Sequence, residues 1–145
     1  MAIRLISAML AQGDGVDAEG KLHIIEPVVG FSYPAEQREQ FRASGEPYAI
    51  AHLPPSRLVL LLWGGKEGQT IHITGSFGLE GEKKGTAVLN NKITWKEKDS
   101  FRLGLEFQGT INFSRTALYE LRLLADGEPL AVVPIIVGWD DEVRL

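Results

Sequence analysis

The chain contains three histidines, His23, His52 and His72, and these are the first residues to consider for acid–base or metal chemistry. A metal site or a proton relay needs several such side chains within bonding distance of one another. No two of these histidines have the i, i+4 spacing of a helical metal pair, and a chain without cysteine cannot form the Cys/His zinc patterns. The sequence therefore favours histidines on polar or half-buried strand faces over a catalytic or metal role.

Carboxylates in two parts of the chain could bind Ca²⁺, which takes oxygen ligands. The first group is Asp14, Asp17 and Glu19, and the second is Asp126, Glu128, Asp140, Asp141 and Glu142. Aspartate is also, with glycine, a residue that tight turns require, and the sequence favours this interpretation over a Ca²⁺ site. The two groups could also lie at opposite ends of the molecule.

No serine lies in the Gly-x-Ser-x-Gly pattern of a nucleophile elbow. The nearest sequence is Gly75-Ser76-Phe77-Gly78, but it falls inside a strand pattern and no helix pattern follows it. The glycine-rich segments 64–68 and 81–85 lack the spacing of a phosphate-binding loop, so we interpret both as hairpin turns. The sequence thus predicts no catalytic, cofactor-binding or metal-binding residue.

Aromatic side chains could line a groove for a sugar or a peptide. The candidates are Trp63, Trp95, Trp139, Tyr33, Tyr48 and Tyr119. Such residues more often fill a core or its rim, so a glycan-binding surface is the less favoured interpretation.

The composition limits the class of protein. The chain has 145 residues, a hydrophobic share of 44% and a formal net charge of −4. That length suits one domain with its own core, and the acidic balance disfavours nucleic acid. Residues 5–11 are apolar but lack a separate basic region, so we do not interpret them as a signal peptide, and no stretch approaches the roughly 20 apolar residues of a membrane helix. We expect a soluble, cytoplasmic protein with no cofactor and no nucleic-acid or membrane partner.

The elements that would position any site are organised around residues 58–63, which are apolar without a break. Pro54 and Pro55 precede this run, and Gly64 and Gly65 follow it. The run is short and is bounded by turn residues at both ends, which is typical of a buried strand. It predicts a strand that is covered on both faces.

Before this central run, the sequence predicts a hairpin from residues 3–12 and 22–25, and extended chain over residues 28–33. Good helix formers over residues 35–43, closed by Ser44 and Gly45, predict a short helix or an ordered loop that Phe41 anchors to the core. Residues 48–53 predict a short strand, and residues 54–56 predict a turn into the central run.

After the central run, apolar and polar residues alternate over residues 71–79, 89–95 and 101–113, which predicts strands with one wet face. Gly75 and Gly78 indicate a bulge or a bend, and Gly109 a kink. The strongest hairpin signal joins residues 118–124 and 130–137 through Asp126-Gly127. Pro134 places the last strand at a sheet edge or a bulge.

Eight or nine short strands with hardly any helix predict an all-β fold, an antiparallel β-sandwich with at most one short helix. A β-barrel is the alternative. We expect one domain over residues 1–138 and a loose, acidic C-terminal tail over residues 139–145.

Two stretches carry a resemblance to a known family. They are residues 7–11 with 19–25, and residues 118–123 with 126–130 and 134–137. Both resemble a bacterial family of uncharacterised single-domain β-sandwich proteins, although Glu26-Pro27 replaces the usual small residues at the close of the second strand. The resemblance implies a bacterial β-sandwich protein and carries no activity.

For function, the sequence favours a non-catalytic protein-binding or assembly module that contacts a protein partner or another copy of itself. Edge strands such as the run around Pro134 would offer the surface for strand addition. The alternative is a domain that binds a small ligand, a glycan or Ca²⁺, or an enzyme with a hidden pocket. Convergence of His52 or His72 with loop carboxylates would indicate the enzyme.

Overall fold

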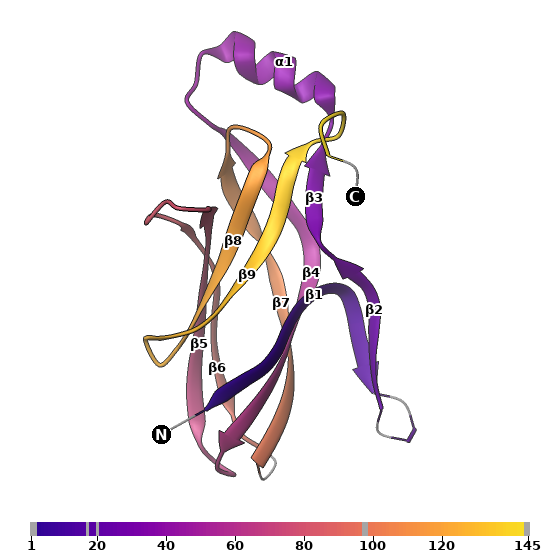
Figure 1. Cartoon of the computed structure of the whole chain (residues 1–145), viewed down its shortest axis with the longest axis vertical. Helices are drawn as coiled ribbons and strands as arrows, with labels where there is room; N and C mark the ends of the chain where they lie inside the picture. The colour runs from indigo at the N-terminus through magenta and orange to yellow at the C-terminus, as the bar shows by residue number, and fades with distance from the viewer. Residues whose placement is uncertain (1–2, 17, 20, 97–98, 144–145) are drawn as a thin grey trace.

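The computed structural model describes residues 3–16, 18–19, 21–96 and 99–143, and for residues 14–16, 22–27, 99–103 and 107–108 it describes the backbone alone. The described chain forms nine strands and one helix (Figure 1). In chain order they are β1 (Arg4–Val16), β2 (Leu22–Val28), β3 (Gly30–Tyr33), α1 (Ala35–Ser44), β4 (Ala49–Gly65), β5 (Thr70–Leu79), β6 (Thr86–Thr94), β7 (Asp99–Phe113), β8 (Ala117–Ala125) and β9 (Glu128–Trp139).

The strands form two sheets that pack around one core. Sheet A has the strand order β2-β1-β4-β7, and sheet B has the order β3-β9-β8-β5-β6. Neighbouring strands are antiparallel except β3 and β9, which are parallel. No ladder of hydrogen bonds joins β6 to β7 in the described part of the chain, so the sheets do not close into a complete barrel. The structure confirms the predicted all-β fold with one short helix.

One nearly continuous extended segment links the two sheets. β2 pairs with β1 in sheet A, and β3 pairs with β9 in sheet B, with Val29 between them. The Val29 carbonyl accepts a hydrogen bond from the Ile136 N–H at 3.1 Å, which fixes the point of transfer. The sheets are therefore joined along this side by the chain itself.

The central strand predicted from residues 58–63 is the middle of β4, between β1 and β7. Leu58, Leu60 and Leu62 are fully buried and face sheet B. Val59 points to the opposite face and is also buried, at 4% exposed. Trp63 departs from the prediction, since its side chain is 46% exposed. The middle of the 58–63 run is thus buried on both faces of sheet A, as predicted, whereas its last residue, Trp63, is not.

The predicted turn over residues 54–56 is wrong. β4 is a single strand of 17 residues that passes through Pro54 and Pro55. Its pairing with β7 shifts register between Leu53 and Ser56, and the Ser56 hydroxyl donates to the Pro54 carbonyl at 3.1 Å. Prolines lack the N–H that a ladder needs, and this bulge takes them out of the ladder without ending the strand.

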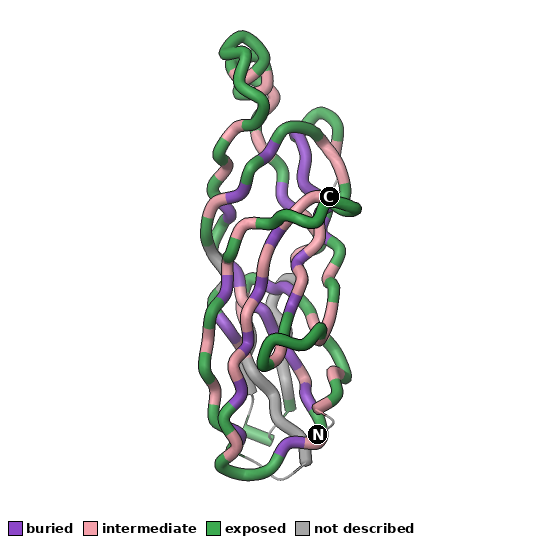
Figure 2. Tube along the Cα trace, turned by 90° about the vertical axis from the view of Figure 1, so that its left-hand side faces the viewer, coloured by how far each residue is buried: buried purple, intermediate pink, exposed green. Residues whose placement is uncertain are grey.

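The alternating patterns become strands with one buried face (Figure 2). In β5, Ile71, Ile73 and Phe77 are buried. The expected bulge lies between Gly75 and Ser76 in the pairing with β6. Of β7, the side chains of Phe101, Leu103 and Phe107 lie outside the described residues.

The hairpin predicted around Asp126-Gly127 is β8–β9, and both turn residues have positive φ, 50° and 83°. This is the left-handed backbone that a two-residue hairpin turn requires. β3 pairs with β9 only from Ile136 onward. Pro134 therefore lies where β9 has β8 as its one ladder partner, as expected for a proline at an edge.

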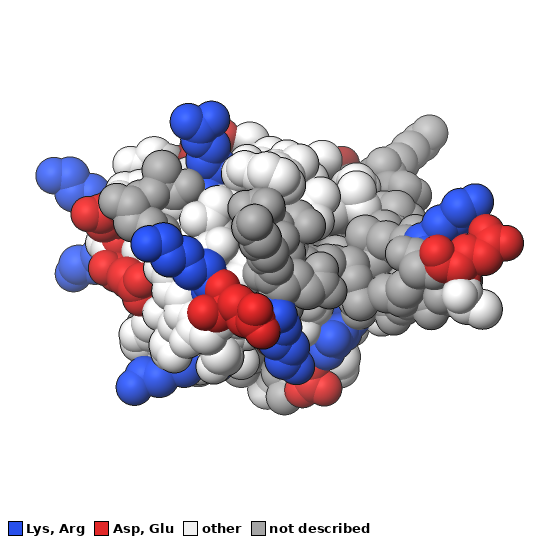
Figure 3. Space-filling model, turned by 90° about the horizontal axis from the view of Figure 1, so that it is seen from below, with Lys and Arg blue, Asp and Glu red and all other residues white. Residues whose placement is uncertain are grey.

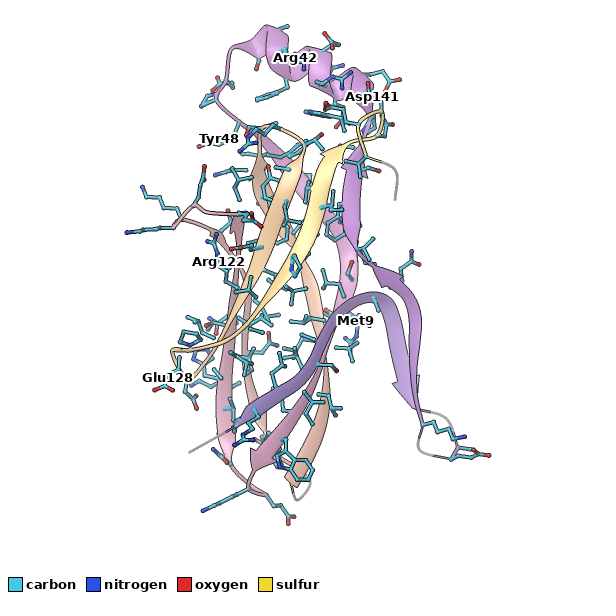
Figure 4. All side chains as sticks on the ribbon, in the orientation of Figure 1. Met9, Arg42, Tyr48, Arg122, Glu128 and Asp141 are labelled. Carbon is cyan, nitrogen blue, oxygen red and sulfur yellow. The ribbon has the colours of Figure 1, made fainter. Side chains whose placement is uncertain are left out.

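The predicted helix is confirmed as α1, which ends at Gly45 with a φ of 72°. The expectation of a loose tail is wrong for residues 139–143. Trp139 is 4% exposed and contacts Phe41 of α1, with ring centroids 6.5 Å apart. Arg38 donates two hydrogen bonds to the Asp141 carboxylate, at 2.6 and 2.5 Å, so the acidic residues bind the helix (Figure 4). Residues 144 and 145 lie outside the described part, and the division at residue 138 stays a prediction.

Candidate functional site

The histidines lie in three different strands. His52 in β4 is exposed, and its carbonyl accepts a hydrogen bond from the Tyr33 hydroxyl at 2.9 Å. The His72 ring in β5 hydrogen-bonds the side chain of Asn90. His23 lies in β2, and its side chain is outside the described residues. No hydrogen bond joins the rings of His52 and His72 to a carboxylate, and no three His, Asp or Glu side chains gather as a metal site in the described chain. The enzyme alternative gains no support here.

The acidic residues of the second group divide between the two ends of β9. Asp126 and Glu128 lie at the β8–β9 turn, at the far end of β9 from the residues after Trp139 (Figure 4). Backbone donors bind two of the carboxylates: the His72 N–H donates to Asp126 at 2.9 Å and the Ala35 N–H donates to Asp140 at 3.0 Å. The side chain of Asp14, and Asp17 as a whole, lie outside the described residues. Asp126 and Asp140 therefore serve the fold.

The Arg38–Asp141 contact shifts the pKa values of both side chains. The hydrogen bonds from Arg38 hold the pKa of the Asp141 carboxyl below its ordinary value, and the same contact raises the pKa of the guanidinium. Thr116 completes this end of the molecule, because its hydroxyl donates to Glu142 at 3.0 Å and accepts from the Trp139 N–H at 3.1 Å. These contacts fasten α1 to the end of β9.

The aromatic residues do not form one groove. Trp95 and Trp139 are buried in the core, and the Tyr33 ring packs on Phe113 with centroids 5.3 Å apart. Tyr48 and Tyr119 do share one cavity, which is described below. No helix in the described ranges is long and apolar enough to cross a membrane. On the face that Figure 3 shows, basic and acidic side chains are interspersed.

The first candidate site is a two-stranded arm that leaves sheet A. β4 pairs with β1 only over Arg4–Ala11, whereas β2 continues to pair with β1 up to Val16. Residues 13–16 and 22–25 therefore form a ribbon without a third strand, and we call them the arm. Figure 1 shows the arm extending sideways from the body of the molecule.

The outer edge of β2 has no partner strand in the described part of the chain. The outer part of β2, Leu22-His23-Ile24-Ile25, includes no Lys, Arg, Asp, Glu or Pro, which are the residues that usually protect an edge from pairing; Glu26 and Pro27 follow it in the same strand. The sequence placed the open edge at the run around Pro134 instead. That expectation holds only for part of β9, because β3 occupies the edge from Ile136 onward.

Apolar side chains are exposed along sheet A, from the base of the arm towards the opposite end of β1. Met9 is 41% exposed and lies opposite Val59, close to the bend where β1 enters the arm (Figure 4). Ile6 is 55% exposed at the bulge of β1, and Trp63 is 46% exposed at the end of the β4 run. The arm thus leaves the body next to a face of sheet A that carries exposed apolar residues.

The second candidate site is a cavity of about 470 Å³ near the end of β5. Its floor includes Phe77 and Tyr119, whose rings are stacked with centroids 5.8 Å apart. Tyr48 and Asn112 line it from the sides, and both are exposed. Burial raises the pKa of Tyr119, so its hydroxyl stays protonated and donates to the Arg115 carbonyl at 3.2 Å.

The β5–β6 turn forms one rim of the cavity and carries Glu82 and Lys84. Backbone hydrogen bonds hold it, from the Glu80 N–H to the Leu118 carbonyl at 3.1 Å and from the Glu82 N–H to the Leu79 carbonyl at 3.1 Å. Arg122 supports the same point, since its guanidinium donates to the Leu79 carbonyl at 2.9 Å and to Glu120 at 3.0 Å. A Cβ at Gly78 would lie 2.7 Å from the Lys84 carbonyl oxygen. The backbone of the turn can therefore approach β5 this closely only because residue 78 is glycine. The rim is therefore fixed by the fold.

Sequence reasoning missed both sites. For the arm, the sequence contains one indication: the apolar run in β2, for which the sequence shows no third strand that would cover it. The cavity had none, because its residues come from four separate parts of the chain. Comparison with protein-family models and with curated protein sequences gives no match.

Proposed function

We propose that this chain is a non-catalytic assembly module that pairs with a second copy of itself through the open edge of β2. One observation carries the proposal: β2 is hydrogen-bonded to β1 on one side and has no ladder partner on the other side within the described residues. An unpaired edge presents a row of N–H and C=O groups to any strand that can lie beside it.

The arm gains from such pairing because a ribbon of two strands is marginally stable in water. A further strand along β2 satisfies the open backbone groups and makes the ribbon part of a wider sheet. The absence of charge and proline from residues 22–25 leaves the outer part of this edge unprotected, up to Glu26 and Pro27.

A second copy is the partner that this edge suits most directly. An antiparallel β2–β2 pair has a two-fold axis, the commonest symmetry of soluble oligomers, and each copy contributes the same edge. Such a pair extends sheet A from four strands to eight across the two copies. The exposed apolar residue Met9 lies next to the base of the arm and would gain cover in the same assembly.

The experiment is the solution mass of the full chain by light scattering across a dilution series. We expect twice the chain mass of 16.0 kDa at high concentration. Ile24→Lys and Ile25→Lys each place a charge on the β2 edge and should return the monomer mass. The control is Val132→Lys on β9, which is 57% exposed and lies outside sheet A, and which should leave the mass unchanged. A wild-type monomer at every concentration contradicts the proposal.

The proposal also includes the expected bacterial family and a cytoplasmic location. Two observations support the family resemblance: the segments that carry it form the β1–β2 and β8–β9 hairpins, and the fold is all-β.

A further inference from the structure

We propose that the cavity beside the β5–β6 turn binds a neutral saccharide, with the ring of Tyr48 packing against the C–H face of the sugar. This inference goes beyond the assembly proposal, because the cavity residues are not those of the arm. A volume of about 470 Å³ is within the usual range of ligand sites, about 300–1,000 Å³.

The apolar surface of the cavity suits a ring. Phe77 and Tyr119 are almost completely buried, so they support the base of the cavity from within the core. Tyr48 is 48% exposed, although large aromatic side chains usually bury most of their area. The exposed ring of Tyr48 offers an apolar surface to a ligand that has its own apolar face.

The polar groups of the cavity suit hydroxyls. The side chains of Asn112, Glu82 and Lys84 form no hydrogen bond or ion pair with another described residue, so their donors and acceptors are available to a ligand. Asn112 can both donate and accept, Glu82 accepts and Lys84 donates. A polyol, whose hydroxyls do both, can use all three.

The charges of the cavity favour a neutral ligand. Glu82 and Lys84 are both exposed on the rim and are of opposite sign, so a lone anion or cation meets one attractive and one repulsive charge. The polar side chains nearest the end of β7, Asn112 and Ser114, carry no charge. A zwitterionic amino acid, the competing ligand class, would need its charged groups at the exposed rim, where solvent screens the attraction.

The experiment is a titration of ¹⁵N-labelled full-length protein with neutral mono- and disaccharides at millimolar concentration, and in parallel with free amino acids. We expect saccharides to shift the amide signals of Gly78, Gly85 and Asn112, and saturation transfer to be strongest for the ring C–H protons. Tyr48→Phe keeps the ring and should bind as the wild type does. Tyr48→Ala should weaken binding about tenfold, the scale of one lost aromatic contact.

The control is Ile50→Ala, which alters a more exposed side chain two residues away that does not line the cavity, and which should leave the affinity unchanged. The inference is overturned if no saccharide of the panel shifts these amides, if amino acids bind there instead, or if Tyr48→Ala binds as tightly as Tyr48→Phe. The Tyr48 variants leave residues 22–25 unchanged, so the solution mass continues to report on the assembly proposal by itself.

Discussion

The β1–β2 hairpin and the β8–β9 hairpin are built from similar sequence signals and have different surroundings. β8 lies between β9 and β5, and its Tyr119, Leu121 and Leu123 are buried in the core. The β1–β2 hairpin keeps β4 as a neighbour only along the first part of β1, and its far half is the arm. A hairpin signal predicts local pairing, whereas the third strand that covers a hairpin comes from a distant part of the chain.

The largest expected effect tests the packed hairpin. Leu121→Asp places a carboxylate at a position that is 0% exposed, with no positive charge to pair with it, and should abolish folding. The matched control is Leu124→Asp in the same strand, at a position that is 36% exposed, and it should fold. Circular dichroism and urea unfolding measure both. A folded Leu121→Asp protein with an unchanged midpoint would falsify the assignment of this face to the core.

A second variant tests the turn of the packed hairpin. Gly127 has a φ of 83°, a backbone region that costs an L-residue about 1 kcal/mol or more. Nothing lies within 4 Å of a Cβ at this position, so Gly127→Ala introduces strain without a clash. We expect the free energy of unfolding to fall by about 1 kcal/mol. Equal stability of the variant and the wild type would show that the turn relaxes.

A third test separates the packed hairpin from α1, which is fastened to its end, by pH. The hydrogen bonds from Arg38 hold the pKa of Asp141 below its ordinary value of 3.8. The contact is therefore fully present above that value and is lost as the pH falls through the lower, folded-state pKa. We expect amide protection in α1 to fall on acidification, while protection in β8 stays.

The matched variant for this pH test is Asp141→Asn, which removes the charge at every pH. Protection in α1 should then be low already at neutral pH and should change little on acidification. An α1 helix that keeps the same protection in the wild type and in this variant would contradict a fastening role for the contact.

The smallest expected effect concerns the arm. Ile24→Lys alters a strand that pairs with β1 alone, so the free energy of unfolding of the monomer should change by less than about 0.5 kcal/mol. The measurement is urea unfolding at a concentration below that of assembly. A loss on the scale of a core substitution would mean that the arm packs on the body, and the contrast between the hairpins would disappear.

The sequence predicted those parts of the fold that depend on local pattern. Alternation in β5 identified Ile71, Ile73 and Phe77 as buried, and Asp126-Gly127 located the turn of the β8–β9 hairpin. The period of two fixes which face of a strand is buried before any partner strand is known. The local turn chemistry does the same for a hairpin loop.

Long-range contacts account for the errors. Pro54 and Pro55 predicted a turn because nothing local shows that the register against β7 shifts at that point. The residues after Trp139 looked loose because Arg38, which binds Asp141, lies about a hundred positions earlier in the chain. The cavity could not be predicted for the same reason, since Tyr48, Asn112 and Lys84 meet only in the folded protein.

The passage of the chain from sheet A to sheet B at Val29 has a mechanical consequence. A pull on the arm travels along β2 through Val29 into β3, which is parallel to β9 over Ile136–Trp139. The force acts along β3, whereas the hydrogen bonds between β3 and β9 run across the strands. The β3–β9 pair is therefore loaded in shear, and its hydrogen bonds share the force. A force that a bound partner applies to the arm is therefore carried by both sheets.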